Sequence, residues 1–352
     1  MANVLKAAVI GAGAISKEHL SFLQKTPQAN LVGVCDLSPA AAKYGAKRYE
    51  AEGAYTNYQD MLAKTSPDVV HVLTPPHTHK MIATDCLQAG AHVICEKPIT
   101  LTLDDFKELW EVAKACDRRL MEDHNYLFNK PILAMQKMVQ AGALGKIQDV
   151  EIRVALDVRA AGGRFADENL PNPIHKMPAG VVHDIITHMV YLALPYLPSI
   201  DHVTAAWNNH GGGDLFKYDD LDALVIGGQT HVRFRFSAYT QPECFMVYVR
   251  GDRGSAETDL FQPYFKSVIP RSGGKQLSPL VNHFVNGRNL VASSFINFYR
   301  KVMQITPYEG LSNLLDKTYY ALAHGQDLPI GYEQMEQTLG LIEALLAEEN
   351  RV

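Results

Sequence analysis

Short apolar runs alternate with segments of helical periodicity over the first third of the chain, and they do so five times. The apolar runs cover residues 6–11, 31–36, 68–74, 91–96 and 119–123. Between the last two runs, the segment 102–115 places Phe106 and Leu109 at helical spacing behind a Thr102 cap. Regular alternation of this kind predicts a parallel sheet covered by helices on both faces.

From residue 147 onward the pattern changes to alternation of apolar and polar positions, which is clearest over 147–158. Three further strand-like runs follow at 221–228, 231–239 and 244–251. Their hairpin-like spacing predicts a mostly antiparallel sheet, with one face covering a helix and the other face open. We therefore predict an α/β protein with a doubly wound parallel sheet first and an α+β domain with an open-faced sheet second.

One apolar segment, PAGVVHDIITHMVYLAL at 178–194, contains an acid and a base that are four residues apart. If 181–194 is a helix ended by Pro195, Asp184 and His188 project from the same face. A separate stripe available for packing consists of Ile185, Met189 and Leu192. The pair is either an acid–base pair facing a cleft or two hydrogen-bonded core residues.

The first strand-to-helix turn has the sequence GAGAIS, in which Ser16 replaces the third glycine of a dinucleotide-binding fingerprint. Gly11 would form the tight turn, and Gly13 would let the backbone approach a pyrophosphate; the same turn includes Ala14 and Ile15. Asp36 ends the second strand, where an acid binds the ribose. An acid there repels a 2′-phosphate, so the sequence favours NAD over NADP.

Composition narrows the class of protein. The 352 residues are 47% hydrophobic and 20% charged with a formal net charge of −5, which is typical of a soluble globular chain and predicts no nucleic-acid surface. No run is long enough to span a bilayer, and the N-terminus does not resemble a secretory signal. Five cysteines without a C-x-x-C pair argue for a reducing compartment, so we expect a cytoplasmic protein.

Several motifs together resemble one known family. The motifs are GAGAISKEH at the start, TPPHTH at 74–79, CEKPIT at 95–100, HNYLF at 124–128 and the D-x-x-x-H of Asp184 and His188. As a set they resemble the glucose-fructose oxidoreductase and inositol dehydrogenase (Gfo/Idh/MocA) family of NAD(P)-dependent oxidoreductases. The resemblance extends from the glycine turn to the closing segment GYEQMEQTLGLIEALL, and no single motif is specific alone.

The resemblance implies that the two parts of the chain have different functions. Residues 1–125 would bind NAD, and residues 126–352 would bind substrate and form the oligomer, with the C-terminal helix able to pack back on the first domain. Beside Gly11, Gly13 and Asp36, the implied cofactor residues are Thr74, Pro75, His79, Glu96 and Lys97. The implied substrate contacts include Asn125 and Tyr126. A homodimer or homotetramer is expected, and an exposed apolar sheet face would require such cover.

The implied reaction is hydride transfer between NAD and a secondary hydroxyl of a sugar, sugar derivative or polyol. His188 is a candidate general base oriented by Asp184, with Lys97 stabilising alkoxide charge; the sequence equally allows Lys97 to be the base. Two other functions stay open. One is an NAD-dependent glycosidase or eliminating enzyme that oxidises a sugar transiently, and the other is a non-catalytic dinucleotide-binding regulator.

The chain departs from the family at several positions. Leu127 stands where the family often has Arg, and Glu122 and Asp123 replace apolar or small residues. The glycine-rich lead-in to the D-x-x-x-H helix is reduced to Ala179-Gly180, and His183 replaces an aliphatic residue. These changes predict a different substrate or a lost activity.

Two further clusters could bind ions. The loop 158–180 carries four basic side chains that could hold a phosphate or carboxylate, or could simply be solvated: Arg159, Arg164, His175 and Lys176. A metal could be held by the H-x-H of His77 and His79, or by His183 with Asp184 and His188. We expect no metal, because no third convergent ligand is visible in the sequence. The family that this chain resembles also works without a metal.

Overall fold

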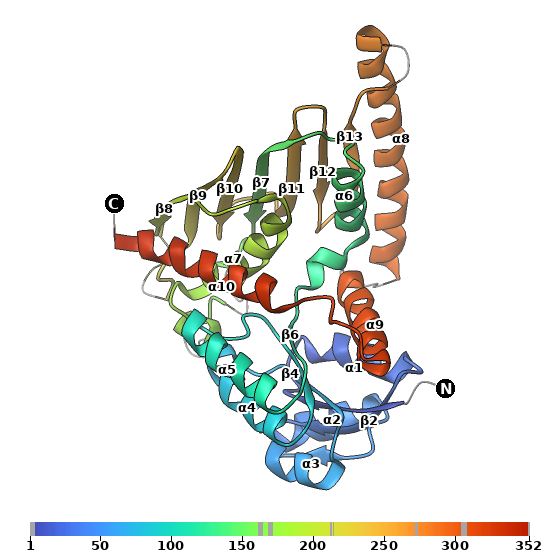
Figure 1. Cartoon of the computed structure of the whole chain (residues 1–352), viewed down its shortest axis with the longest axis vertical. Helices are drawn as coiled ribbons and strands as arrows, with labels where there is room; N and C mark the ends of the chain where they lie inside the picture. The colour runs from blue at the N-terminus through green and yellow to red at the C-terminus, as the bar shows by residue number, and fades with distance from the viewer. Residues whose placement is uncertain are drawn as a thin grey trace. The chain divides into compact units, whose positions relative to one another are not determined.

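The computed structural model describes residues 4–160, 165–167, 172–211, 213, 215–271, 274–303 and 308–350. Arg164, one of the predicted loop cations, lies outside the described residues. The chain divides into two compact units, one formed by the chain up to Asn125 with Gly310–Gly340, the other by Tyr126–Glu309 with the chain from Leu341 on. Each unit is built around its own sheet (Figure 1).

The first unit contains a six-stranded sheet in the order β3-β2-β1-β4-β5-β6, and every neighbouring pair is parallel. Its strands are β1 (Leu5–Ile10), β2 (Ala29–Cys35), β3 (Ala54–Tyr55), β4 (Val69–Val72), β5 (His92–Cys95) and β6 (Leu120–Glu122). This is the doubly wound order of a Rossmann fold, which confirms the predicted fold class. The five predicted strands all form, and the missed β3 has only two residues.

Helices flank this sheet. They are α1 (Ser16–Lys25), α2 (Pro39–Arg48), α3 (Tyr58–Thr65), α4 (His79–Gln88), α5 (Leu103–Ala115), α9 (Glu309–His324) and the first part of α10 (Tyr332–Ala347), whose residues from Leu341 on belong to the second unit; short 3₁₀ turns are η1 (Pro76–Thr78) and η2 (Asn125–Phe128). At α5 the hydroxyl of Thr102 accepts a hydrogen bond of 3.1 Å from the backbone N–H of Asp105, as its cap position predicts. Phe106 and Leu109 are fully buried, so the predicted apolar face packs inward.

The second unit contains a seven-stranded sheet in the order β13-β12-β11-β7-β10-β9-β8, in which β7 and β10 are parallel and the other described neighbours are antiparallel. The strands are β7 (Ile147–Ala155), β8 (His202–Asn208), β9 (Asp220–Gly227), β10 (Thr230–Ser237), β11 (Cys244–Gly251), β12 (Ser255–Asp259) and β13 (Lys266–Val268). The mostly antiparallel prediction is confirmed, although β8, β12 and β13 were not predicted.

The helices of this unit are α6 (Lys130–Gln140), α7 (Gly180–Ala193) and α8 (Gly274–Val302), with 3₁₀ turns η3 (Pro173–Lys176), η4 (Leu194–Tyr196) and η5 (Glu348–Asn350). Helix α7, which bears Asp184 and His188, packs on β7 and β10 (Figure 1). It contacts the sheet face that buries Val150, Ile152 and Phe234. None of the described helices combines the length and the apolar character needed to cross a bilayer.

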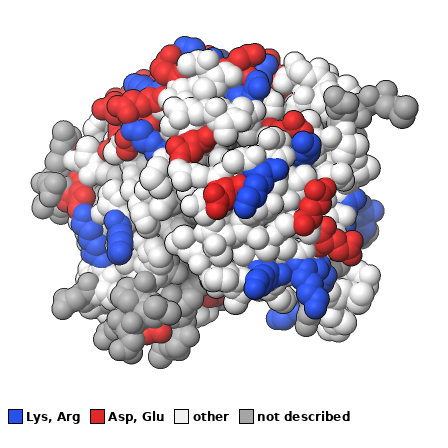
Figure 2. All heavy atoms as spheres, turned by 90° about the horizontal axis from the view of Figure 1, so that it is seen from below, with Lys and Arg blue, Asp and Glu red and all other residues white. Residues whose placement is uncertain are grey.

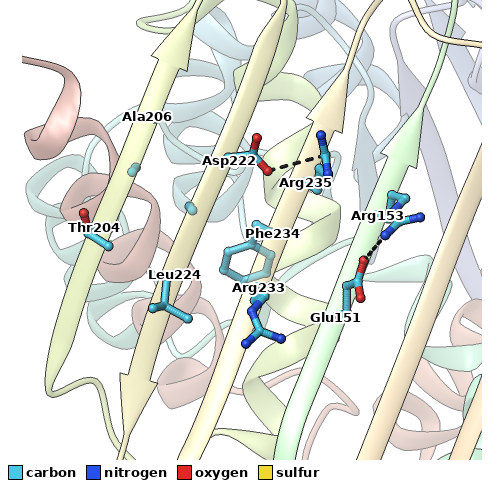
Figure 3. A pocket seen from close by; sticks show the side chains of 11 residues that line it. Glu151, Arg153, Thr204, Ala206, Asp222, Leu224, Arg233, Phe234 and Arg235 are labelled. Atoms are coloured by element: carbon cyan, nitrogen blue, oxygen red, sulfur yellow. Dashed lines mark hydrogen bonds and ion pairs between the residues drawn. The ribbon is translucent and has the colours of Figure 1, made fainter. Parts of the chain in front are cut away.

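The opposite face of the seven-stranded sheet is mixed, with charged side chains of β7, β9 and β10 beside apolar ones such as Leu224 (Figure 3). Figure 3 shows charged side chains from neighbouring strands on this face, and they form ion pairs. The pairs are Arg153 with Glu151, Arg235 with Asp222 at 3.5 Å, and Arg233 with Asp149 at 3.1 Å. The predicted open face is thus only partly apolar, and the expected oligomer stays a prediction. Figure 2 shows a further face of the molecule, on which acidic and basic side chains intermingle.

Candidate active site

The turn after β1 has the geometry that a bound dinucleotide needs. Gly11 has a φ of +100°, and a Cβ there would lie 2.6 Å from the carbonyl oxygen of Leu73, so only glycine fits. A Cβ on Gly13 would meet nothing within 4 Å, so its backbone is open to a ligand. The hydroxyl of Ser16 donates to the carbonyl of Gly13 at 2.7 Å, which ties the start of α1 to the turn.

Asp36 joins this turn to the loop after β2. Its Oδ2 accepts a 2.7 Å hydrogen bond from the N–H of Ala12, and its Oδ1 accepts one of 2.8 Å from Ser38. Each carboxylate oxygen keeps a second lone pair, so both can also accept from ligand hydroxyls. Asp36 therefore has a structural role that sequence analysis did not anticipate, in addition to its predicted ribose contact. Ala14 is exposed and Ile15 half-buried within the same turn.

His79 connects the segments that follow β4 and β5. Its ring is fully buried, with Nδ1 2.8 Å from the carbonyl oxygen of Pro98 and Nε2 2.6 Å from that of Thr74. Burial lowers the pKa of His79, and the two carbonyl acceptors partly oppose that effect. A neutral ring can donate to one of these oxygens only. These contacts position both loops, while direct cofactor contact by Thr74, Pro75 or His79 stays a prediction.

Lys97 follows β5, at the edge of the sheet where ligands bind in doubly wound folds. Its side chain is half-buried, and its backbone N–H lies 3.2 Å from Oε2 of Glu96. Two residues further on, the N–H of Ile99 donates to Oε1 of Glu122 at 2.8 Å. The Oε2 of Glu122 lies 2.8 Å from Nε2 of His124, and both side chains are fully buried. The departure at Glu122 thus anchors the loop that carries Lys97.

A second buried network lies beside Glu96. Nε2 of His19 lies 3.4 Å from Oε1 of Glu96 and 3.5 Å from Oδ2 of Asp123. Nδ1 of His19 lies 2.8 Å from Nδ1 of His71, whose Nε2 lies 2.8 Å from the hydroxyl of Tyr319. His19, His71 and Tyr319 are fully buried, and Asp123 is nearly so. We refer to these five residues as the His19 network.

The charged side chains in the His19 network change one another's pKa values. Burial alone would lower the pKa of His19, but Asp123 and Glu96 outweigh it and raise that pKa to about 9. Burial would raise the pKa of Glu96, yet His19 holds it below its usual range. Burial, with the charge of Glu96, raises the pKa of Asp123 to about 6. At neutral pH an imidazolium therefore lies between two carboxylates.

The remaining hydrogen bonds of the network define which ring nitrogen of His71 carries the hydrogen. Burial and the charge of His19 hold the pKa of His71 well below its usual range, so His71 is neutral and its Nδ1 accepts from His19. Its Nε2–H then donates to the oxygen of Tyr319. His19, His71 and Tyr319 were not among the predicted site residues. The available signals were a histidine inside an apolar strand and the unusual acid at Asp123.

In the second unit, the less buried side of α7 presents His188. Its Nδ1 lies 2.7 Å from the hydroxyl of Tyr191, which also accepts from the N–H of Tyr126 at 3.3 Å. The Tyr126 ring packs edge-on against His188 with centroids 4.8 Å apart. Asp184 is buried with 9% exposure. Tyr191 was missed in the sequence although it lies three residues after His188.

The predicted packing stripe of α7 is partly wrong. Met189 and Leu192 are buried as expected, but Ile185 is half-exposed on the same less buried side as His188. Almost every other position of α7 is buried, including His183, because the helix is apolar nearly all round. A narrow apolar stripe was therefore the wrong description of this helix.

The basic side chains of the 158–180 loop do not all remain available. Arg159 is bound to Asp219 at 2.8 Å and lies over the ring of Tyr239, and Nε2 of His175 lies 2.7 Å from the carbonyl oxygen of Phe165. Lys176 is exposed. An anion-binding role for this loop stays a prediction, and the pairing of Arg159 with Asp219 weakens it.

Among the described residues, one group has ligand atoms close enough to hold a cation. These atoms belong to His19, Glu96 and Asp123 and lie within 4.8 Å of one another. His77 is exposed, whereas both ring nitrogens of His79 lie against carbonyl oxygens. The alternative of an H-x-H metal pair formed by His77 and His79 is therefore not supported.

We predict that dialysis against a strong chelator leaves activity unchanged, because the His19 imidazolium already lies against both carboxylates of Glu96 and Asp123. Elemental analysis before and after dialysis is the measurement. A stoichiometric transition metal that leaves together with the activity would contradict the prediction.

The order of the six parallel strands, the glycine turn after β1 and the acid after β2 define a dinucleotide-binding α/β unit. A model of an oxidoreductase family with an NAD-binding Rossmann fold matches residues 5–124. Residues 5–124 therefore carry the NAD-binding domain of the Gfo/Idh/MocA family.

The individual relatives have low sequence identity to this chain. D-glucoside 3-dehydrogenase of Escherichia coli K12 is 30% identical over 205 residues, which cover 57% of each chain. Across that protein and three further curated relatives, the match covers 45–57% of the relative's own length. Inositol 2-dehydrogenase of Rhizobium meliloti is 25% identical over 85% of this chain and 90% of that protein. A levoglucosan dehydrogenase solved with NADH and levoglucosan has a TM-score of 0.77 at 17% identity, over 99% of this chain and 97% of that one.

Proposed function

We propose that the protein is an NAD-dependent dehydrogenase that transfers a hydride between NAD and a secondary hydroxyl of a sugar, sugar derivative or polyol. The observation that carries the proposal is the match to inositol 2-dehydrogenase, which covers 85% of this chain and so includes residues of both units. The glucoside and levoglucosan dehydrogenases are named for related carbohydrate substrates.

The glycine turn supports NAD as the cofactor. Gly11 allows the close turn, Gly13 leaves its backbone accessible, and Asp36 offers carboxylate lone pairs to ribose hydroxyls. When bound, NAD would accept a hydride from the carbinol carbon or return it. The protein must therefore supply the proton transfer and the binding of the substrate hydroxyl.

His188 is the proposed general base. Its Nδ1 is engaged by the Tyr191 hydroxyl, so Nε2 is the nitrogen that would take the carbinol proton. Asp184, one helical turn earlier, would favour the imidazolium that forms. Lys97 would hold the substrate oxygen and stabilise its developing negative charge. The assignment of base and stabiliser can be exchanged between His188 and Lys97, and the pH profiles of single variants would distinguish the two.

Asp36 should make NAD(H) bind more tightly than NADP(H). We expect Asp36→Ala to weaken NAD binding by ~10–100-fold, since hydrogen bonds to a charged group contribute ~1.5–3 kcal/mol, and to narrow the gap between the two cofactors. Asp36→Asn is the matched control, because it keeps the shape and removes the charge. Calorimetric titration measures all four affinities for each variant. Equal binding of the two cofactors by the unmodified protein would refute the role of Asp36.

The proposal is tested by offering sugars, glycosides and polyols to the purified protein with NAD and following NADH by its absorbance. We expect net NADH formation that is stoichiometric with a ketone product. Cleavage of a glycoside without net NADH would instead identify an eliminating enzyme. Binding of NAD without turnover of any substrate class would favour a regulatory protein.

A further inference from the structure

Helix α8 turns a polar side toward its own unit. It runs beside β13 at the edge of the seven-stranded sheet (Figure 1). Asn282 and Asn286 are buried there, and their side-chain amides donate to the carbonyls of Ile269 and Ser267, each at 2.9 Å. Asn297 likewise donates to Pro263 at 3.1 Å. The side that packs on the protein is therefore held by asparagine hydrogen bonds rather than by an apolar stripe.

The apolar side of α8 faces outward. We call it the outer stripe of α8, and its most exposed aromatic members are Phe284, Phe295 and Phe298, with exposures of 74%, 72% and 70%. The stripe also includes Leu277, Leu280, Val281, Val291, Ile296, Tyr299, Val302 and Met303. An amphipathic surface helix normally has the reverse orientation, with its apolar side on the core. The outer stripe is therefore a surface that requires cover.

The size of the outer stripe matches a stable interface. Aromatic side chains present ~150–250 Å² each, so its four aromatics and seven aliphatic residues expose on the order of 1,000 Å². The largest apolar patch on a typical monomer is ~300–600 Å², whereas one side of a standard protein–protein interface buries ~800 Å². Large aromatic side chains at its centre are also the residues that dominate binding energy in interfaces.

The sequence of the stripe is complementary to itself when two copies run antiparallel about Val291. This register places Phe284 opposite Phe298 of the other copy, and Phe295 opposite Gly287. A Cβ on Gly287 would meet nothing within 4 Å in its own chain, so the space beside Gly287 can accept a large side chain. Knobs that enter such holes are the usual packing of two helices that cross at a small angle.

We propose that the outer stripe of α8 is a self-association surface, on which a second copy of this chain packs its own α8 in antiparallel orientation. A lipid surface is the weaker fit. Residues 274–302 contain no acid, but Arg300 is already paired with Glu309, which reduces the basic charge that a membrane helix would use. The proposal is independent of the dehydrogenase function.

Sedimentation velocity of the full chain tests the proposal. We expect a mass that is a multiple of 39.0 kDa, and we expect Phe295→Glu to weaken association by at least ~30-fold. Gly287→Leu should weaken it as well, although this change improves helix propensity and fills no space inside the chain. Tyr44→Glu, at an aromatic on α2 that is 69% exposed, is the matched control and should leave the mass unchanged.

Cross-linking tests the antiparallel register. Val291→Cys should form a disulfide between copies under mild oxidation, whereas Leu280→Cys should not, because residues at position 280 of the two copies would lie ~30 Å apart along the axis. The unmodified chain controls for its native cysteines. Cross-linking of both variants would contradict the antiparallel register. A monomer at every concentration, an unchanged mass for Phe295→Glu, or a monomer that floats with anionic vesicles would overturn the proposal.

Discussion

Replacement of His188 by alanine is expected to lower turnover by ~10²–10⁴-fold and to leave NAD binding nearly unchanged. The loss has the size that general acid–base groups contribute. NAD binding should persist because the glycine turn and Asp36 belong to the first unit, whereas His188 lies on α7 of the second. Steady-state kinetics on the best substrate, paired with calorimetric NAD titration, measures both quantities. His202→Ala, at an exposed histidine on β8, is the control and should retain activity.

Further variants test whether Lys97, Asp184 and His188 contribute jointly to catalysis. Lys97→Ala should lose activity on the same scale, and Lys97→Ala/His188→Ala should cost less than the product of the two single losses. Asp184→Asn should lower turnover indirectly, by changing the orientation and charge of His188. Tyr191→Phe removes only the hydroxyl at Nδ1, so it should shift the pH profile more than it lowers the maximum rate. Near-normal turnover of both His188→Ala and Asp184→Asn would return the pair to the core-residue interpretation.

Replacement of His19 by glutamine is expected to lower the free energy of unfolding by about 3–5 kcal/mol at neutral pH. The change leaves the carboxylates of Glu96 and Asp123 close together without their imidazolium, and removing one partner of a buried ion pair costs this much. His19→Gln/Asp123→Asn should recover part of the loss because it removes one of the two carboxylate charges. Urea unfolding measures both variants, with His92→Gln on β5 as the control. Equal stability of His19→Gln and the unmodified chain would contradict the ion pairing of His19 with the two carboxylates.

The same network predicts the pH dependence of stability. The pKa of His19 is raised from 6.5 to about 9, so its contribution is complete below 6.5 and is lost as the pH rises through about 9. The pKa of Asp123 is raised from 3.8 to about 6, so its protonated form is favoured in the folded state and stability falls as the pH rises through about 6. Asp123→Asn should abolish this lower step. Urea titrations across both windows check the two directions.

The features that could be predicted from the sequence are those that depend on residues close together in the chain. The five apolar runs and the glycine turn identified the first sheet, because strand, turn and helix signals there are adjacent in the chain. The His19 network could not be predicted in this way, since its members come from α1, β4, α9 and the residues directly after β5 and β6. Only the fold brings these five side chains together.

Burial was harder to predict than secondary structure. The apolar and polar positions of α8 alternate as in any amphipathic helix, and nothing local indicates that Asn282 and Asn286 face the protein while Phe295 faces outward. Similarly, Ile185 of α7 belongs to an apolar run but lies on the less buried side with His188. In both helices, the neighbouring strands decide which side is buried.

Transfer of deuterium from a labelled substrate to the cofactor tests the proposed hydride transfer most directly. A sugar or polyol that supports activity, deuterated at the reacting carbinol carbon, is incubated with the protein and NAD, and both nucleotide and product are examined by mass spectrometry. The account predicts singly deuterated NADH that accumulates in equal amount with an unlabelled ketone. Recovery of unlabelled NAD together with a cleaved product that retains the deuterium would contradict it.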